Sequence, residues 1–333
     1  MIADAGTLRW ARHLNCVRMN VATERMGPRA MSGGCGIALL LAMAVCTAMA
    51  QGVGKENWGP KPTYLGFDRN DYPGDGALST LRRSFRYTSY WLNPPPGEKA
   101  NSWSDRRAIL RRYGFGFLVL YDGRTDAELK LAAWKGMSAE DLGTADGKAA
   151  AAAAVREGFP RDVLIFLDQE EGGRLLPEQA DYVFAWIDGV RAAGAGAGVY
   201  CSGLEVTDSS GTISTADDIA TRERTREVGS GAPKHERRLA MWIADDRCPP
   251  SPGCALEAPP VDAGVGAARR PLITEFATVW QYAQSPRRKQ FSATCPANQA
   301  ADGNCYVPGL PPSANTFVDL DTANSPDPSE AAR

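Results

Sequence analysis

The sequence predicts an α/β protein built as a (β/α)8 TIM-type barrel, regular or irregular, with disulfide-bearing loop insertions. Eight short apolar segments alternate with helical patterns, which is typical of βα units around a parallel sheet. The roughly 270 residues that follow the amino-terminal region fit the ~250 residues typical of such a barrel. The alternative is an open doubly wound sheet. Its first strand would be followed by a glycine-rich phosphate loop, and GFDRNDYPGDG at 66–76 is not one.

The strand candidates follow from their residue types. The segment at 64–68 is short, apolar and ends in Asp, and 85–92 is rich in aromatic and β-branched residues. The segments at 115–123 and 162–170 are mainly apolar, as in parallel sheets whose strands are buried on both faces. The remaining candidates lie at 197–203, 239–246, 277–283 and 316–321.

Helical patterns lie between several of these strands. A helix over 102–114 ends at a glycine, one over 138–158 begins at a serine cap candidate, and one over 176–194 has a proline near its start. Two longer segments, 204–238 and 247–272, follow strands and do not fit a tight barrel. We expect both to rise over the face where the strands end.

Four parts are expected along the chain: a signal peptide at 1–50, a linker at 51–63, the barrel at 64–322 and a disordered tail at 323–333. Residues 31–50 have an apolar centre that is too short to span a bilayer comfortably, since about 20 residues are needed. They end in the small-residue pattern AMA, which is typical of a cleaved secretory signal. The alternative is an amino-terminal membrane anchor. Residues 1–25 are interpreted as an upstream mis-start.

The charge balance excludes some partners. Removing residues 1–50 takes away five of the 37 basic and two of the 39 acidic residues, which leaves 32 and 37 and a net charge of −5. A mildly acidic protein has no electrostatic footprint for nucleic acid. We expect a secreted, periplasmic or cell-envelope monomer, without nucleic acid and without stable membrane insertion after signal cleavage.

Five cysteines follow the predicted signal, and outside the cytosol close pairs indicate disulfides. The loops CPPSPGC and CPANQAADGNC are short, so we predict the pairs Cys248–Cys254 and Cys295–Cys305. Cys201 is left over and is expected to be buried and inert. The alternative is a metal site, which would need clustered thiolates or imidazoles. A single histidine remains, so we expect no metal and no cofactor.

Carboxylates gather where the predicted strands end, and the carboxyl ends of barrel strands meet on one face. They are Asp68, Asp122, Asp168, Glu170, Asp245, Asp246, Asp319 and Asp321. Asp168 and Glu170 point to the same side of a strand because side chains alternate with period two. One carboxyl of such a pair can stay protonated while the other is ionised. A proton donor beside a carboxylate is the equipment of glycoside hydrolysis.

Aromatic residues near the same strand ends would suit sugar rings, although core packing is the more common role for any one of them. The aromatic candidates are Tyr90, Trp91, Tyr121, Trp242, Trp280 and Tyr282. As substrate-binding residues we predict Tyr90, Tyr121, Trp242, Asp245, Trp280, Gln281 and Tyr282.

Six motifs resemble, in order and spacing, a bacterial family of secreted glycoside-hydrolase-like barrels, a domain-of-unknown-function family similar to the family 25 glycoside hydrolases, or muramidases. They are GFD at 66–68, FLDQE at 166–170, GVYCSG at 198–203, MWIADD at 241–246, VWQYA at 279–283 and VDLD at 318–321. The resemblance covers about 64–322.

The resemblance implies that Glu170 is a general acid, that Asp168 assists charge stabilisation, and that Asp68 and Asp319 complete an acidic floor. It also implies a β-1,4 bond of peptidoglycan as substrate. Glu171 is expected to be a bystander. The sequence therefore predicts a secreted glycosidase acting on peptidoglycan or another polysaccharide. The alternatives are a non-catalytic glycan- or wall-binding barrel and a metal-dependent phosphodiesterase, which the single histidine disfavours.

Overall fold

A computed structural model describes residues 62–229, 238–263, 277–291, 293–296, 298–311 and 316–332. These residues belong to one compact unit, Pro60–Arg333. The predicted signal peptide and most of the predicted linker lie outside the described residues. Within the described part of the chain, no helix is long and apolar enough to cross a membrane.

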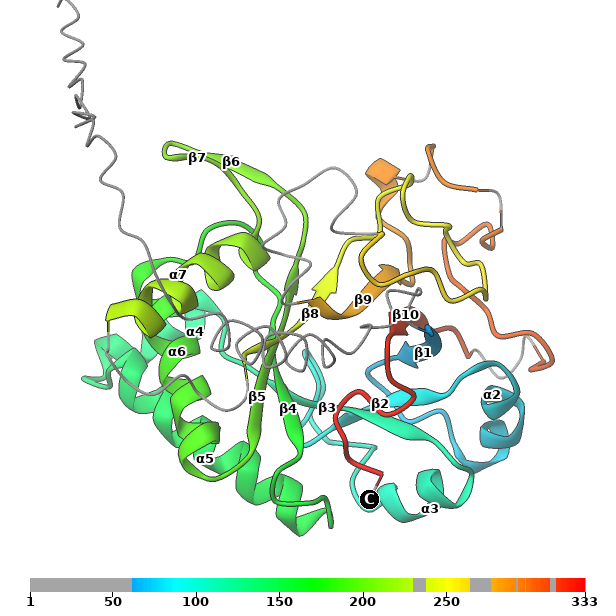
Figure 1. Cartoon of the computed structure of the whole chain (residues 1–333), viewed down its shortest axis with the longest axis horizontal. Helices are drawn as coiled ribbons and strands as arrows, with labels where there is room; N and C mark the ends of the chain where they lie inside the picture. Colours follow the sequence, from blue (N-terminus) through cyan, green and yellow to red (C-terminus); the bar gives the residue numbers. More distant parts are fainter. Residues whose placement is uncertain are drawn as a thin grey trace, which may run out of the picture. The chain divides into compact units, whose positions relative to one another are not determined.

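Eight strands form a closed barrel, as the sequence predicts (Figure 1). They are β1 (Tyr64–Asp68), β2 (Tyr87–Trp91), β3 (Gly116–Asp122), β4 (Leu164–Gln169), β5 (Gly196–Ser202), β8 (Ala240–Ala244), β9 (Ala277–Ala283) and β10 (Asp319–Ala323). Around the barrel they run β1-β10-β9-β8-β5-β4-β3-β2. The strands are five to seven residues long, and each overlaps one of the segments predicted from the sequence. The last strand begins three residues later than expected.

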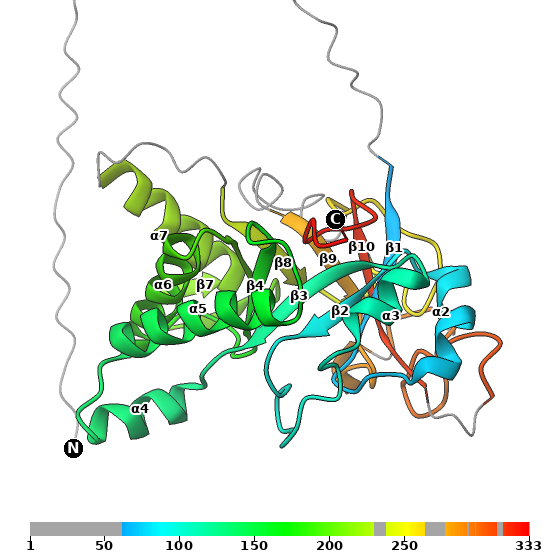
Figure 2. The same cartoon turned by 90° about the horizontal axis from the view of Figure 1, so that it is seen from below.

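Helices cover the barrel on two sides, with α4 to α7 on one and α2 and α3 on the other (Figure 2). Their bounds are α2 (Leu78–Ser84), α3 (Arg107–Arg112), α4 (Asp126–Trp134), α5 (Ala139–Arg156), α6 (Pro177–Ala192) and α7 (Thr215–Gly229), with short 3-10 turns η1 (Asp75–Ala77) and η2 (Lys289–Phe291). An exposed hairpin, β6 (Val206–Asp208) and β7 (Gly211–Ile213), precedes α7. Helices α2 and α4 and the hairpin were not predicted.

The longest helix, α5, packs closely on α6 because its contacting face is made of small residues. A Cβ atom on Gly143 would lie 2.3 Å from the carbonyl oxygen of Tyr182, and one on Gly147 would lie 2.4 Å from that of Trp186. Only glycine allows this approach of two backbones. The alanine-rich sequence between 149 and 154 serves the same close packing while keeping helix propensity high.

The barrel departs from a regular (β/α)8 arrangement at its last strand. Strand β10 runs antiparallel to both of its neighbours, β1 and β9, whereas the other barrel pairs are parallel. The chain leaves β9 at the rim formed by the carboxyl ends of the parallel strands and enters β10 from that same rim. Asp319 at the start of β10 therefore lies opposite Asp68 at the end of β1.

The predicted disulfide pairing is wrong, although the four cysteines are correct. The bonds are Cys248–Cys295 and Cys254–Cys305. Each joins the loop after β8 to the loop after β9, which lie side by side over the barrel rim. Short spacing along the chain suggested closure within each loop, but the packing of the two loops brings cysteines of different loops together. Cys201 is free and buried.

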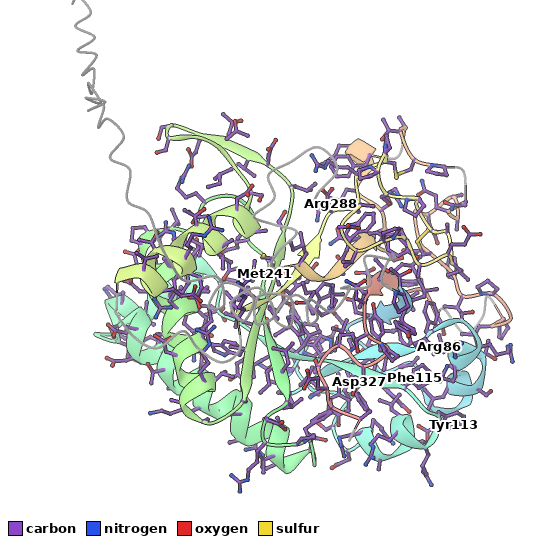
Figure 3. The ribbon with its side chains drawn as sticks, in the orientation of Figure 1. Arg86, Tyr113, Phe115, Met241, Arg288 and Asp327 are labelled. Atoms are coloured by element: carbon purple, nitrogen blue, oxygen red, sulfur yellow. A yellow bond between two sulfur atoms is a disulfide. The ribbon has the colours of Figure 1, made fainter. Side chains whose placement is uncertain are left out.

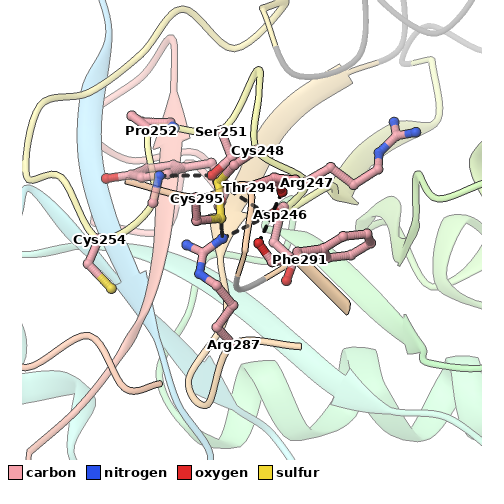
Figure 4. Close-up of a disulfide and its surroundings, with 12 residues drawn as sticks. Asp246, Arg247, Cys248, Ser251, Pro252, Cys254, Arg287, Phe291, Thr294 and Cys295 are labelled. Atoms are coloured by element: carbon pink, nitrogen blue, oxygen red, sulfur yellow. Dashed lines mark hydrogen bonds between the residues drawn. A yellow bond between two sulfur atoms is a disulfide. The ribbon is translucent and has the colours of Figure 1, made fainter. Parts of the chain in front are cut away.

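Arg287 lies against the first disulfide (Figure 4). Its Nη1 donates to the carbonyl oxygen of Asp246 at 3.0 Å, and it contacts the sulfur atoms of Cys248, at 3.1 Å, and Cys295. The guanidinium is almost wholly buried, and this burial lowers its pKa. A single arginine thus links the end of β8 to both loops.

The segment after β10, expected to be disordered, is packed against the end of the barrel opposite to the loops. Figure 3 shows Asp327 near Phe115, well apart from Arg288 in the loop region. Ser329 is fully buried. Its amide donates to the carbonyl oxygen of Phe117 at 3.0 Å, and its Oγ accepts a hydrogen bond from the amide of Val119 at 2.9 Å. Composition suggested disorder, but these backbone groups of β3 need the tail as a partner.

We predict that Ser329→Ala lowers the free energy of unfolding by about 1–3 kcal/mol, because the buried amide of Val119 loses its acceptor. Urea unfolding of the two proteins measures the difference. The matched control is Asn324→Ala, at an exposed position of the same segment, which should stay within about 0.5 kcal/mol of the parent. Equal stability of the Ser329 variant and the parent would contradict the packed tail.

Candidate active site

A small cavity of about 80 Å³ lies at the rim where the parallel strands end. Each of the eight barrel strands contributes to it. Its lining residues are Asp68, Asn70, Trp91, Leu120, Asp168, Glu170, Tyr200, Trp242, Gln281, Gln284 and Asp319. The carboxyl ends of barrel strands converge on one face, and the site was predicted from the sequence on this basis.

All four carboxyls predicted as catalytic line this cavity. Asp68 and Asp168 are buried, Asp319 is half-buried, and Glu170 is exposed. Strand β4 ends at Gln169, so Glu170 follows the strand and extends from its rim. The structure thus brings Asp168 and Glu170 to one side, as their spacing predicted.

Gln281 is hydrogen-bonded to four of the other lining residues. Its Nε2 donates to Oδ2 of Asp68 at 2.9 Å and to Oδ2 of Asp319 at 3.4 Å, and its Oε1 accepts from the hydroxyl of Tyr200 at 2.9 Å. Gln284 donates to the same Oε1 at 3.0 Å. The amide is therefore held between two carboxyls on one side and two donors on the other.

Asp68 and Asp321 form a buried carboxyl pair beneath the cavity. Burial raises the pKa of Asp68 to about 6, and its hydrogen bonds oppose the rise. The pKa of Asp321 is raised well above its usual range by burial and by the charge of Asp68. Trp242 Nε1 donates to Oδ1 of Asp321 at 2.9 Å. A proton on the other oxygen of Asp321 satisfies that atom by donating to Asp68.

The β4 carboxyls lack such partners. Among the described residues, Oδ1 of Asp168 is buried without a hydrogen bond. The pKa of Asp168 is raised well above its usual range by burial, then by the charges of Glu170 and Asp122. Burial also raises the pKa of Glu170. Within the described ranges, neither carboxyl forms an ion pair. An unpartnered acceptor facing a cavity is suited to a bound donor group.

The floor of the site depends on one glycine. A Cβ atom on Gly66 would lie 1.9 Å from the ring of Tyr87, which occupies the barrel interior beside β1. The pKa of the Tyr87 hydroxyl is raised well above its usual range by burial and by the charge of Asp321. The ring therefore stays neutral and closes the space beneath the carboxyl pair.

Only two of the seven predicted substrate-binding residues, Trp242 and Gln281, line the cavity. Trp280 and Tyr282 flank Gln281 and point to the outer side of the barrel because side chains alternate along β9. Trp280 Nε1 donates to the carbonyl oxygen of Asp245 at 2.8 Å, and the Tyr282 hydroxyl donates to a loop carbonyl at 2.5 Å.

The other three predicted residues also lie outside the cavity. The carboxylate of Asp245 is paired with Arg247, at 2.8 and 2.5 Å. Tyr90 is buried, and its hydroxyl donates to Glu157 at 2.5 Å. Tyr121 packs against Trp186. Side chains alternate along a strand, and Trp91 and Leu120 line the cavity. Tyr90 and Tyr121, the residues next to them in sequence, therefore point away from it.

Sequence reasoning did not name four lining residues, which are Asn70, Leu120, Tyr200 and Gln284. Trp91 was an aromatic candidate but was not among the predicted substrate-binding residues. Leu120 could have been found by alternation, because it lies two residues before Asp122 on β3. Tyr200 lies opposite Asp168 in the register of β4 and β5, and the sequence alone does not give that register. Asn70 and Gln284 lie in loops, where no such rule applies.

Within the described ranges, no group of three or more histidine, cysteine, aspartate or glutamate side chains could hold a metal ion.

Residues 86–246 match the sequence model of a family described as the Rv2525c-like, glycoside hydrolase-like domain. The expected family resemblance is confirmed. The match to this glycoside hydrolase-like family includes Asp168 and Glu170, whereas Asp68, Gln281 and Asp319 lie outside the matched residues. No curated protein matches the chain.

Several solved structures are similar to this chain at low identity. An uncharacterized protein of B. stearothermophilus is 18% identical, covering 78% of this chain and 95% of that one, with a TM-score of 0.47. The Tat-secreted protein Rv2525c of Mycobacterium tuberculosis is 14% identical, covering 79% and 96%, with a TM-score of 0.41. The bacterial lysozyme from Streptomyces coelicolor is 13% identical, covering 79% and 92%, with a TM-score of 0.40.

The raised pKa of Asp68 predicts a pH dependence of stability. The folded state holds its proton up to about pH 6 and the unfolded state only to about 3.8. The protonated Asp68 therefore contributes about 3 kcal/mol to the free energy of unfolding below about pH 3.8. This contribution is lost as the pH rises through 6.

Urea unfolding between pH 4 and 7 checks this prediction by comparing the parent with Asp68→Asn. The stability of the variant should fall less over that interval, because it carries no titrating group at this position. Glu98→Gln, at an exposed position, is the control and should follow the parent. Parallel curves for the parent and Asp68→Asn would contradict the prediction.

Proposed function

We propose that this protein is a secreted glycoside hydrolase that cleaves β-1,4 bonds of peptidoglycan or a related glycan by carboxylate acid–base catalysis. The observation that carries the proposal is the pair Asp168 and Glu170 at the cavity, one buried without a partner and one exposed at the rim, both with raised pKa values. Cleavage of a glycosidic bond requires a carboxyl that stays protonated and can donate its proton to the oxygen of the leaving sugar. The match to a family described as glycoside hydrolase-like supports the same reaction class.

Glu170 takes the role of general acid in this proposal. It is the exposed member of the set, so a glycosidic oxygen can reach its proton. As the bond from that oxygen to the sugar ring breaks, positive charge develops on the ring. Asp168, buried within the cavity, is placed to stabilise this charge when ionised. The assignments fit attack by a protein carboxylate or by an acetamido group of the substrate.

The remaining lining residues are suited to holding the substrate. Tyr200 and Gln281 offer hydroxyl and amide groups whose orientation is set by their mutual hydrogen bond. Trp91 and Trp242 present apolar surface at the same cavity. Sugars present hydroxyl groups at their edges and apolar faces, and such a mixed lining matches them. We expect the protein to act as a monomer.

Secretion to the periplasm, the cell envelope or beyond is part of the proposal. The signal-like sequence at 1–50 supports it. The two disulfides support it as well, because such bonds persist in oxidising compartments.

A glycan- or wall-binding barrel without catalysis is the second candidate. The small volume of the cavity, about 80 Å³, favours it, because little of a sugar ring fits below the rim without movement of the loops.

We predict that Glu170→Gln lowers the release of reducing ends from purified peptidoglycan by at least ~10²-fold, the scale expected when a general acid is lost. The protein beginning at Gln51 is compared with the variant. The matched control is Glu171→Gln. Glu171 Oε2 accepts from the amide of Asp126 at 2.9 Å, at the start of α4, and also bonds Gln179, so it serves the fold and not the cavity.

Glu171→Gln should retain the parent's activity, since a glutamine oxygen can accept the same hydrogen bonds. The result would favour the binding barrel if the parent releases no reducing ends and both the parent and Glu170→Gln sediment with the wall material.

A further inference from the structure

The cavity at the barrel rim is rich in acceptors. Four of its eleven lining residues are the carboxyls Asp68, Asp168, Glu170 and Asp319, and none of the described residues that line it is lysine, arginine or histidine. Only 6% of Asp168 is exposed, and its Oδ1 has no hydrogen-bond partner in the described part of the chain. A buried acceptor in this position costs free energy unless a ligand supplies a donor.

The side-chain donors of the same lining are already bonded within the protein. Each donates to a protein oxygen at 2.9–3.4 Å. A ligand therefore meets an unpartnered acceptor at Asp168 and donors that are already in use, so a group that only donates is matched best. The donor side chains are those of Asn70, Trp91, Tyr200, Trp242, Gln281 and Gln284.

Two arginines lie beside this lining, and both are directed elsewhere. Arg288 donates to Oε1 of Gln284 at 2.8 Å, and the guanidinium of Arg69 lies 5.9 Å from the ring centre of Phe317. Within the described ranges, neither arginine is paired with Asp168. Burial and the charges of neighbouring carboxyls raise the pKa of Asp168, and a bound cation acts in the opposite direction because it favours the ionised form.

The rings and the size of the cavity indicate which kind of cation fits. Trp91, Tyr200 and Trp242 all contribute to the lining, and the rings of Tyr200 and Trp242 lie 4.9 Å apart at 70°. Aromatic rings attract organic cations. A volume of about 80 Å³ admits a small group but little of a sugar ring. A compact ammonium group attached to a larger molecule meets both conditions.

We propose that this cavity binds the free amino group of an amino sugar, so that the preferred glycan carries an unacetylated amine at this point. An ammonium group presents three donors and no acceptor, and Asp168 accepts one of them. An acetamido group keeps one donor and adds a carbonyl oxygen, which meets carboxyl oxygens without a donor between them. The glycan in this inference rests on the proposed function, whereas recognition of the amine is a property of the cavity.

Binding of two tetrasaccharides tests the inference, a β-1,4 glucosamine tetramer and its fully N-acetylated counterpart. Titration calorimetry near pH 7 of the protein beginning at Gln51 should show at least ~10-fold tighter binding of the amine form, the scale of a hydrogen bond to a charged group. Asp168→Asn should reduce the preference to within about twofold. Glu98→Gln, at an exposed position after β2, should keep it, and controls for general attraction between an acidic protein and a cation.

Equal binding of the two tetrasaccharides by the parent overturns the inference, and so does a preference that survives in Asp168→Asn. The comparison within the parent needs no variant. If Asp168→Asn does not fold, Glu170→Gln takes its place, because Glu170 is exposed at the rim. Loss of its charge should weaken the preference for the amine, and an unchanged preference in that variant likewise overturns the inference.

Cleavage separates this inference from the proposed function. Release of reducing ends by the parent is compared between peptidoglycan as isolated and the same material after de-N-acetylation. Faster release from the acetylated material would leave the glycosidase in place and remove the amine site. A preference for the glucosamine tetramer in a protein that releases nothing from either material would leave the amine site in place and remove the glycosidase.

Discussion

Closure of the barrel by the antiparallel strand β10 is the constraint on which the rest of the structure depends. Without it, β1 and β9 would expose unpaired edges. The register of the closure pairs Asp68 with Asp319 and Gly66 with Asp321, so three carboxyls enter one small volume. Gln281 on β9 then bonds two of them. The acidic site is in this sense a product of the way the sheet closes.

Several carboxyls are buried together at this end of the barrel. Burial disfavours their ionised forms and neighbouring charges repel one another, so their pKa values rise and they retain protons. The buried pair Asp68 and Asp321 shows one solution, with a tryptophan donor and a shared proton. At the β4 rim, Asp168 remains without a hydrogen bond among the described residues. The pair Asp68 and Asp321 lies beneath the cavity and has its hydrogen bonds within the protein. At Asp168, a bound ligand would supply the hydrogen bond that the described residues do not.

Much of the fold could be predicted, because strands and helices depend on local sequence. Apolar runs identified all eight barrel strands, and proline and glycine marked the ends of α6. The missed helix α4 also had a local signal, since Thr125 and Glu128 form a capping box at its start. The disulfide partners and the packed tail had none. They depend on which loops lie together and on which backbone groups of β3 need a partner, and both are long-range properties.

The candidate site was predicted in part for the same reason. Carboxyls at strand ends can be found from the sequence alone, because period two and the polarity of a parallel barrel send them to one rim. By itself the sequence thus determined the strands, the acidic rim with Asp68, Asp168, Glu170 and Asp319, and the family resemblance. Only the tertiary structure decided that Trp91 and Tyr200 face the cavity while Tyr90, Trp280 and Tyr282 do not, that β10 runs antiparallel, and that Asp122 lies opposite Asp168. These facts depend on strand register and on the path of loops, which are set by contacts between residues far apart in the chain.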